Sequence, residues 1–290
     1  MPADLVARLG SRALVPGEVR TDWEVPDYLG LLARDGVAAE LDDVVRRARA
    51  LRRLDPDRMR AVLSALADPP AAELNKARIA AAAGLPVTSL SPYVDLLVRL
   101  GVLDLLPGCR AAVAKRAIGR PQAVFADPAV ARHLAGDPVS LLGELAGRRR
   151  LQPLLRGMVA VELLRQRDTS AVEHRVSYLR ERNGLEVDLV VELPDDSLFG
   201  IEVRTAAALR PHQFTALHAL ARRAGGRFRG GWCSTPRPAG TGTGRGCGAC
   251  RSPPCGSERS PGVAHRAPDR QPRVMSASGA VQRPVAASGA

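Results

Sequence analysis

Aromatic side chains are scarce in this sequence, because phenylalanine, tryptophan and tyrosine together make up only 3% of the 290 residues. Stacking of bases on aromatic rings is a main source of affinity for single-stranded nucleic acids, so a binding surface of that type is not expected. Lysine is nearly absent as well: only Lys76 and Lys115 occur, and the net charge of +12 comes almost entirely from arginine. A basic chain favours anionic partners without specifying one.

Long apolar runs are also missing. No stretch of about 18 apolar residues occurs, so no membrane-spanning helix is expected. The first ten residues, MPADLVARLG, lack the apolar centre of a signal peptide, and we predict a cytoplasmic protein with no membrane partner. The cysteines, at positions 109, 233, 247, 250 and 255, are odd in number and mostly lie in one low-complexity segment, which argues against a disulfide framework.

Two familiar ligand motifs are absent. The CGAC run at 247–250, with Cys255 and His265, fits no standard zinc-finger spacing, so no zinc site is predicted. The phosphate-loop motif GxxxxGK[ST] occurs nowhere. The glycine-rich run at 240–246 has neither the Lys-Ser/Thr pair nor a strand before it, so we expect no ATP binding.

The segment from Ser234 to Ala290 contains no Leu, Ile, Phe, Tyr or Trp. Such a composition cannot bury enough apolar surface to offset the entropy of ordering, so residues 234–290 are predicted to be a disordered tail. Eight arginines against Glu258 and Asp269 give this tail a net charge of +6, half of the total. A shifted reading frame near codon 231 would explain the tail, since the alternative frame begins with an apolar Val-Val-Leu.

Three helices followed by two strands are predicted between residues 55 and 127, an order typical of a winged helix-turn-helix. Asp55 can cap the first helix, and Pro56 suits its first turn. The second helix spans 73–83. Thr88 can cap the third, which has Pro92 in its first turn and is closed by Gly101. Strands at 102–106 and 123–125 enclose a Pro107-Gly108 turn. The inward apolar residues are Met59, Val62, Leu63 and Leu66 of the first helix and Leu90, Tyr93, Val94, Leu97 and Leu100 of the third.

In a DNA-binding winged helix, the third helix enters the major groove. Its exposed residues here are predicted to be Ser89, Ser91, Asp95 and Arg99, which offer one base against one acid. This is a poor match for phosphate, so a structural subdomain or a protein-binding surface is favoured over direct reading of bases.

The stretch 109–120 is the most basic part of the folded region. Lys115 and Arg116 are its best candidates for phosphate contact with DNA or RNA, although a Lys-Arg pair beside a strand is more often simply solvated.

The clearest chemical pattern lies on two predicted strands. In residues 185–192 apolar residues alternate with acids, the period of a half-buried strand, and a turn at 194–197 leads to its hairpin partner at 198–204. Asp188 lies on the first strand, and Glu202 and Arg204 share one face of the second. Two carboxylates are ligands that Mg²⁺ prefers, and the ion can activate a water for attack on phosphate. The alternative is a solvated strand edge, where acid-x-base patterns are common.

Together these motifs resemble the C-terminal region of bacterial and archaeal AAA-family ATP-binding proteins, in which a winged helix and a nuclease-like domain of unknown function follow the ATPase core. The resemblance covers about residues 25–233. It rests on YVDLLVRLGVLDLLP at 93–107, Lys115-Arg116, Pro121, Asp127, MVAVELLRQ at 158–166, LEVDLVVE at 185–192 and GIEVR at 200–204.

The resemblance implies a PD-(D/E)xK nuclease fold with Asp188 and Glu202 as catalytic, metal-binding acids and Arg204 in the place of the usual lysine. Glu162 and Gln213 are predicted as additional site residues. Arginine stabilises phosphate but is a poor proton acceptor, and Arg156 stands where an earlier acid is usual. Magnesium-dependent phosphodiester hydrolysis is therefore expected to be weak or absent.

The absent ATPase core implies a truncated family member with a separate ATPase subunit as a partner. The alternatives are a non-enzymatic module that binds nucleic acid or protein, and the non-functional product of a pseudogene. The predicted fold class is α+β or α/β. Its parts are a helical remnant at 1–54, a winged-helix-like domain at 55–127, a nuclease-like mixed sheet at 128–233 with helices at 128–135, 139–148, 151–166 and 211–224, and the tail at 234–290.

Overall fold

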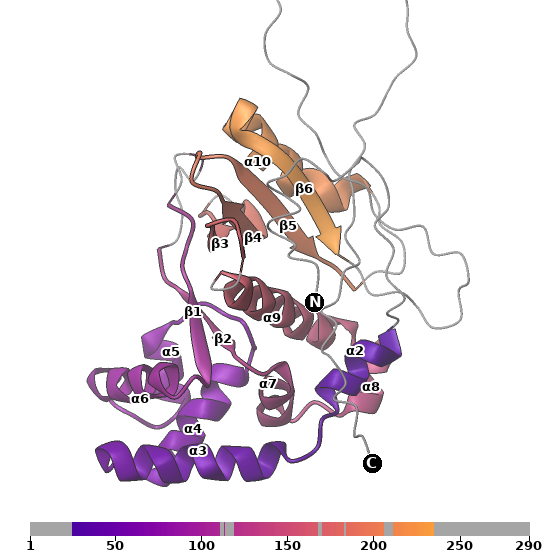
Figure 1. Cartoon of the computed structure of the whole chain (residues 1–290). Coiled ribbons are helices and arrows are strands. Elements are labelled where there is room, and N and C mark those ends of the chain that lie inside the picture. The colour runs from indigo at the N-terminus through magenta and orange to yellow at the C-terminus, as the bar shows by residue number, and fades with distance from the viewer. Residues whose placement is uncertain are drawn as a thin grey trace, which may run out of the picture.

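The computed structural model describes residues 25–110, 113, 119–167, 170–182, 184–205 and 211–234 (Figure 1). Within these ranges the protein is a mixed α+β structure, 53% helical, with a two-stranded and a four-stranded sheet. The predicted fold class is confirmed. Lys115, Arg116 and the tail beyond Ser234 lie outside the described residues.

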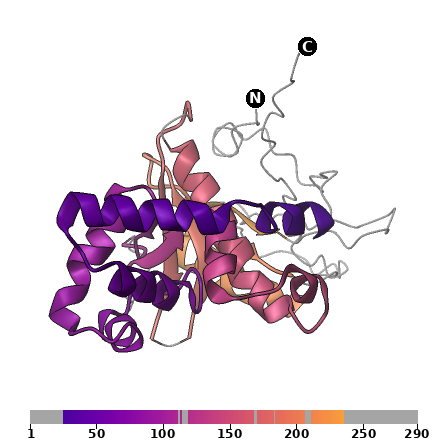
Figure 2. The same ribbon diagram turned by 90° about the horizontal axis from the view of Figure 1, so that it is seen from below.

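The first part of the chain, which we call the helical unit, runs from residue 25 to residue 143. Its two strands pair antiparallel, with Leu103 opposite Phe125. The longest helix of the unit, α3, lies along the bottom of Figure 1 and across the front of Figure 2. The elements are α2 (Val25–Leu32), α3 (Val37–Arg52), α4 (Pro56–Ala67), α5 (Lys76–Ala82), α6 (Val87–Arg99), β1 (Leu103–Leu106), β2 (Gln122–Phe125), α7 (Pro128–Ala135) and α8 (Val139–Gly143).

Helix ends in this unit follow the capping rules. The side chain of Asp55 accepts hydrogen bonds from the N–H groups of Asp57 and Arg58 and begins α4, as predicted. At the end of α6, Gly101 adopts a left-handed φ of 70°. The N–H of Val102 then bonds to the carbonyl of Leu97 at 3.0 Å, which closes the helix in a Schellman motif.

Two helix starts were predicted wrongly. Helix α5 begins at Lys76 rather than at residue 73, because the side chain of Asn75 caps it. Glu73 instead forms an antiparallel β-bridge with Gln122, the first residue of β2. Helix α6 begins at Val87, one residue before Thr88, and has no side-chain cap. Pro92 consequently lies inside the helix and not in its first turn.

The second part of the chain, the sheet unit, runs from residue 148 to residue 234. Strands β3, β4 and β5 are antiparallel neighbours, and β6 adds to β5 in parallel after a crossover through α10. The predicted hairpin of two strands around residue 195 is confirmed. The elements are α9 (Arg148–Gln166), β3 (Arg175–Arg180), β4 (Glu186–Glu192), β5 (Leu198–Val203), η1 (Pro211–Phe214), α10 (Thr215–Ala224), η2 (Gly225–Arg227) and β6 (Phe228–Ser234).

Three element bounds in and beside this unit differ from the prediction. Helix α8 ends at Gly143, so the predicted helix 139–148 is shorter, and α9 starts at Arg148 and contains Pro153. The predicted helix 211–224 opens with a 3-10 turn. Residues 231–234 form the end of strand β6 in the given sequence. An apolar strand at this point had been expected only from the alternative reading frame.

The four-stranded sheet is covered on both faces, with α9 on one and α10 on the other (Figure 1). Ala160 and Val161 of α9 belong to a core that includes Leu189 and Ile201. A second core, on the other face, joins residues of α10 to Val187, Val190 and Leu198. Strand β4 is therefore buried from Val187 to Val191, and the prediction of a half-buried strand was wrong.

A β-bulge interrupts β4. Ser177 lies opposite Val190 and Leu179 lies opposite Val187, so the single residue Tyr178 faces both Asp188 and Leu189. The extra residue breaks the alternation. Val187 packs in the core beside α10, whereas Leu189 packs in the core beside α9, although both were predicted on one face.

The helical unit is joined to the sheet by backbone hydrogen bonds. Beyond β1 the chain continues along β3 instead of turning at Pro107-Gly108 as predicted. The N–H of Tyr178 bonds to the carbonyl of Pro107, and the N–H of Cys109 bonds to the carbonyl of Tyr178 at 2.7 Å. The outer edge of β3 is thereby covered at this point.

Helix α9 is part of the sheet unit by sequence, but its side chains pack in the cores of both units. Its first half, with Leu151, Leu154 and Leu155, packs with α2–α7 in the core of the helical unit, and its second half packs on the sheet. Among the helices of the described ranges, none is by itself long and apolar enough to cross a membrane; α5 and α6 meet that test only together, across a bend of 95°.

The close packing of α10 on the sheet can be tested at Gly200. A Cβ at this position would lie 2.6 Å from Leu217 Cδ2 and 3.0 Å from Leu220 Cδ2, inside a fully buried layer. We expect Gly200→Ala to lower the free energy of unfolding by about 1–3 kcal/mol, measured by urea denaturation. Gly226→Ala is the matched control, since nothing lies within 4 Å of its Cβ position. Equal stability of the two variants would contradict this packing.

Candidate functional site

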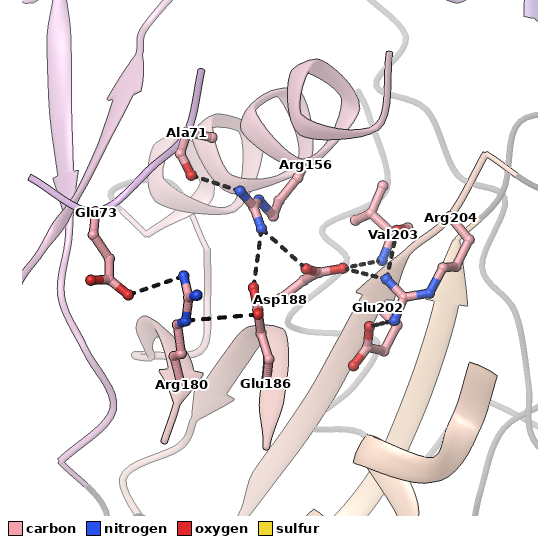
Figure 3. A network of polar contacts seen from close by, with 9 residues as sticks. All are labelled: Ala71, Glu73, Arg156, Arg180, Glu186, Asp188, Glu202, Val203 and Arg204. Carbon is pink, nitrogen blue, oxygen red and sulfur yellow. Dashed lines mark hydrogen bonds and ion pairs between the residues drawn. The ribbon is translucent and has the colours of Figure 1, made fainter. Parts of the chain in front are cut away.

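Asp188 lies at the bulge of β4 and is 6% exposed. Its Oδ2 accepts a hydrogen bond from the N–H of Val203 at 2.8 Å and another from Arg204 Nη1 at 3.1 Å (Figure 3). Both donors lie at the end of β5. A buried carboxylate is stable only when hydrogen bonds and opposite charge replace its lost hydration, and these two contacts supply both.

Glu202 is the most buried acid of the site, at 1% exposure. Its Oε2 contacts Arg204 Nη2. The guanidinium of Arg204 therefore bridges the two carboxylates, one through each of its terminal nitrogens, as Figure 3 shows. The structure brings the three residues that were predicted as a site together, and their catalytic role stays a prediction.

Arg156, on α9, contacts the site from the other side. Its Nη1 lies 3.5 Å from Asp188 Oδ1 and 3.5 Å from Glu186 Oε1, and its Nη2 donates to the carbonyl of Ala71 at 2.8 Å. From the sequence, Arg156 was seen only as a departure from the family pattern. Its position on the helix before the sheet was the available signal that it faces the acids.

Further ion pairs continue toward the helical unit. Arg180 Nη1 lies 3.2 Å from Glu73 Oε1, and Arg180 Nε lies 3.9 Å from Glu186 Oε2. We call the whole set the ion-pair chain. It contains four carboxylates and three guanidiniums, and most of it was not foreseen, because its members come from five separate segments. The members are Glu73, Arg180, Glu186, Arg156, Asp188, Arg204 and Glu202.

The two additional predicted residues have different surroundings. Glu162, on α9, is half-buried and accepts a hydrogen bond from Gln166, one turn later on the same helix, at 2.8 Å. This hydrogen bond lies within α9 and involves neither acid of the pair. Gln213 is half-buried in η1, the short 3-10 turn before α10.

The fit of the acid pair to Mg²⁺ can be judged from these contacts. Mg²⁺ requires near-octahedral oxygen ligands, and carboxylates must face it with their lone pairs. Both oxygens of Asp188 already contact guanidinium or N–H donors, and Glu202 contacts Arg204. Within the described ranges, no group of three or more His, Cys, Asp or Glu residues is placed to hold a metal ion. In this arrangement the residues do not fit a bound Mg²⁺, and the predicted magnesium site stays a prediction.

Tyr178, opposite the bulge, is also part of this polar region. Its hydroxyl donates to the carbonyl of Arg120, and its ring is almost fully buried. Burial, together with the nearby charges of Glu73 and Glu186, raises the pKa of Tyr178 to about 12, although Arg180 opposes the shift.

Two stretches of the chain match known families. Residues 153–245 match DUF4143, a domain of unknown function that is often found in AAA-ATPase-associated proteins. Residues 35–140 match DUF8612, another domain of unknown function. The ion-pair chain connects the two matched stretches. Glu73 lies in the stretch 35–140, and the other members lie in the stretch 153–245. Comparisons with curated proteins and with solved structures find no match.

The contribution of the buried acid can be measured with Asp188→Ala. Removing one partner leaves two guanidiniums short of a counter-charge, so we expect the free energy of unfolding to fall by about 3 kcal/mol in urea denaturation. Asp57→Ala is the control, because Asp57 is almost fully exposed and its pair with Arg60 is worth at most about 1 kcal/mol. A loss no larger than that of the control would show that the acid is not held by a buried network.

The raised pKa of Tyr178 predicts a pH dependence. In the unfolded chain the phenol ionises near its ordinary value of 10, and in the folded chain only near 12. Between these values unfolding releases a proton, so stability falls as pH rises from about 10 to about 12. We expect Tyr178→Phe to have a flatter unfolding midpoint over pH 9–12 than the wild type. Parallel curves would contradict the buried, charge-flanked position of the hydroxyl.

Proposed function

We propose that this chain is a non-cleaving, nuclease-like binding module that works with a separate AAA-family ATPase, and that arginines replace the metal ion at its acid pair. The observation that carries the proposal is the bridge formed by Arg204 between Asp188 and Glu202, with Arg156 on the other side of Asp188. Two guanidiniums balance the two carboxylates, so no cation is needed to hold the acids together.

Hydrolysis of a phosphodiester requires an activated water, either on a metal ion or beside a base. The arginines cannot accept a proton at practical pH. Asp188 and Glu202 are buried, and their oxygens already contact Arg204, so they are not positioned to take a proton from an attacking water. These features support a site that keeps the nuclease-like arrangement of strands without its chemistry.

The ATPase partner is supported by two facts. The chain has no phosphate-loop motif, yet residues 153–245 match a domain that is often found in AAA-ATPase-associated proteins. We therefore infer that an AAA-family ATPase is the partner to which this chain binds.

We favour a protein over a nucleic acid as the partner. We interpret α4, α5 and α6 with the β1–β2 pair as a winged helix whose third helix, α6, presents an almost neutral face. Asp95 and Arg99 are both exposed there, and Lys76 donates to Ser91 at 2.9 Å. A phosphate backbone would require a row of unopposed cations. Steeply salt-dependent binding of a labelled DNA or RNA duplex would instead favour the nucleic-acid alternative.

A cleavage assay tests the absence of chemistry. The full chain is incubated with single- and double-stranded DNA and RNA in Mg²⁺ or Mn²⁺, beside Asp188→Ala. We expect both proteins to remain at the background rate. Metal-dependent cleavage by the wild type that is lost in Asp188→Ala would overturn the proposal and make Asp188 catalytic.

A restoration experiment tests the role of the arginines more directly. Arg156→Glu combined with Arg204→Lys returns the acid and the lysine of the nuclease pattern and makes the pocket more negative. We expect this double variant to bind Mn²⁺ in calorimetry, and the wild type not to, with circular dichroism as the check on folding. Adding Asp188→Asn should abolish the binding. Equal Mn²⁺ affinity of the wild type and the double variant would show that the arginines do not stand in for a metal ion.

A further inference from the structure

We propose that Arg156 couples the helical unit to the acid pair, so that a partner bound to the helical unit changes the ion pairing of Asp188. The proposal rests on the proposed function only in that the regulated site is the one assigned there. The coupling itself follows from the contacts of one guanidinium with two parts of the fold (Figure 3).

Arg156 lies at the point where α9 passes from one core to the other. Leu155 packs in the core of the helical unit, and Ala160 packs on the sheet. From this point the guanidinium donates to the carbonyl of Ala71 in the helical unit and contacts Asp188 and Glu186 on β4. A shift of the Ala71 carbonyl therefore changes the position of the charge beside Asp188.

The segment around Ala71 is held in an unfavourable conformation. Ala71 has a φ of 52°, a left-handed value that alanine seldom adopts and that persists only where the surroundings impose it. The surroundings here are the start of β2, because the carbonyl of Ala72 accepts from Ala123 and Leu74 donates to the carbonyl of Pro121. The segment is thus attached to the β1–β2 pair and moves with it.

A second route connects the same segment to the same acid. Glu73 pairs with Arg180, Arg180 reaches Glu186, and Glu186 also contacts Arg156. Glu73 and Arg156 are mostly covered, whereas the side chains of Arg180 and Glu186 are 48% and 41% exposed. With Glu73 neutral, Arg180 keeps only Glu186 as an acid within the ion-pair chain and competes for it with Arg156, so the change reaches Asp188 through Arg156.

The N–H of Val203 is a direct reporter of Asp188, because it donates to Oδ2 at 2.8 Å. Its amide exchange rate rises when that carboxylate leaves its position. We expect Glu73→Gln to accelerate exchange at Val203 by about threefold or more, and Arg156→Gln to accelerate it further. Glu40→Gln is the matched control: it breaks an exposed pair with Arg34 in the same helical unit and should leave the rate unchanged.

Two results would overturn the coupling. One is an unchanged rate at Val203 in Glu73→Gln, with acceleration in Arg156→Gln, which would make the contact with Asp188 purely local. The other is equal acceleration of Val203 and of the amides of α10, which would report a general loss of stability. Neither measurement uses metal or nucleic acid. Cleavage by the wild type would overturn the proposed function alone, and an uncoupled Val203 would overturn the linkage alone.

Combining Glu73→Gln with Arg156→Gln tests whether the effect passes through Arg156. We expect the double variant to exchange at Val203 no faster than Arg156→Gln alone, because the route from Glu73 is already interrupted. If the two accelerations multiply, the substitutions act independently and the proposed linkage is rejected.

Discussion

The sheet unit depends on a guanidinium that lies between two buried carboxylates. Asp188 and Glu202 are both almost inaccessible to solvent, and neither could remain ionised there without opposite charge and hydrogen-bond donors. Arg204 supplies both, and Arg156 adds a second positive charge from α9. Because arginine presents several donors in one plane and does not lose its proton, it can hold two acids at once, which a lysine in its place would do less well.

The bulge in β4 influences which side of the sheet the side chain of Asp188 faces. In a regular strand Asp188 would follow the alternation that its neighbours set, but the extra residue opposite Tyr178 brings it within reach of Arg156. The same bulge divides the apolar residues of β4 between two cores, so that α9 and α10 both find an apolar surface. The ionic contact and the two-layer packing thus share one structural origin.

Local chemistry in the sequence was sufficient for much of the fold. The cap at Asp55, the left-handed Gly101 and the turn between β4 and β5 depend on residues close in the chain, and each was predicted. The bulge could not be predicted, because alternation in residues 185–192 fits a regular strand equally well. Arg156 and Glu73 were missed as site residues for another reason: their partners lie 32 and 107 positions away, and no local pattern encodes such a distance.

The arginine at position 156 has a consequence beyond charge balance. A glutamate at position 156 would repel Asp188 unless a cation lay between them, and it could not donate to the carbonyl of Ala71. Arg156 neutralises Asp188 and also donates a hydrogen bond to the carbonyl of Ala71 in the helical unit. Arg156 therefore also forms a contact between the two parts of the chain. Asp188 therefore has a structural role, because it contacts the guanidinium that also binds the helical unit.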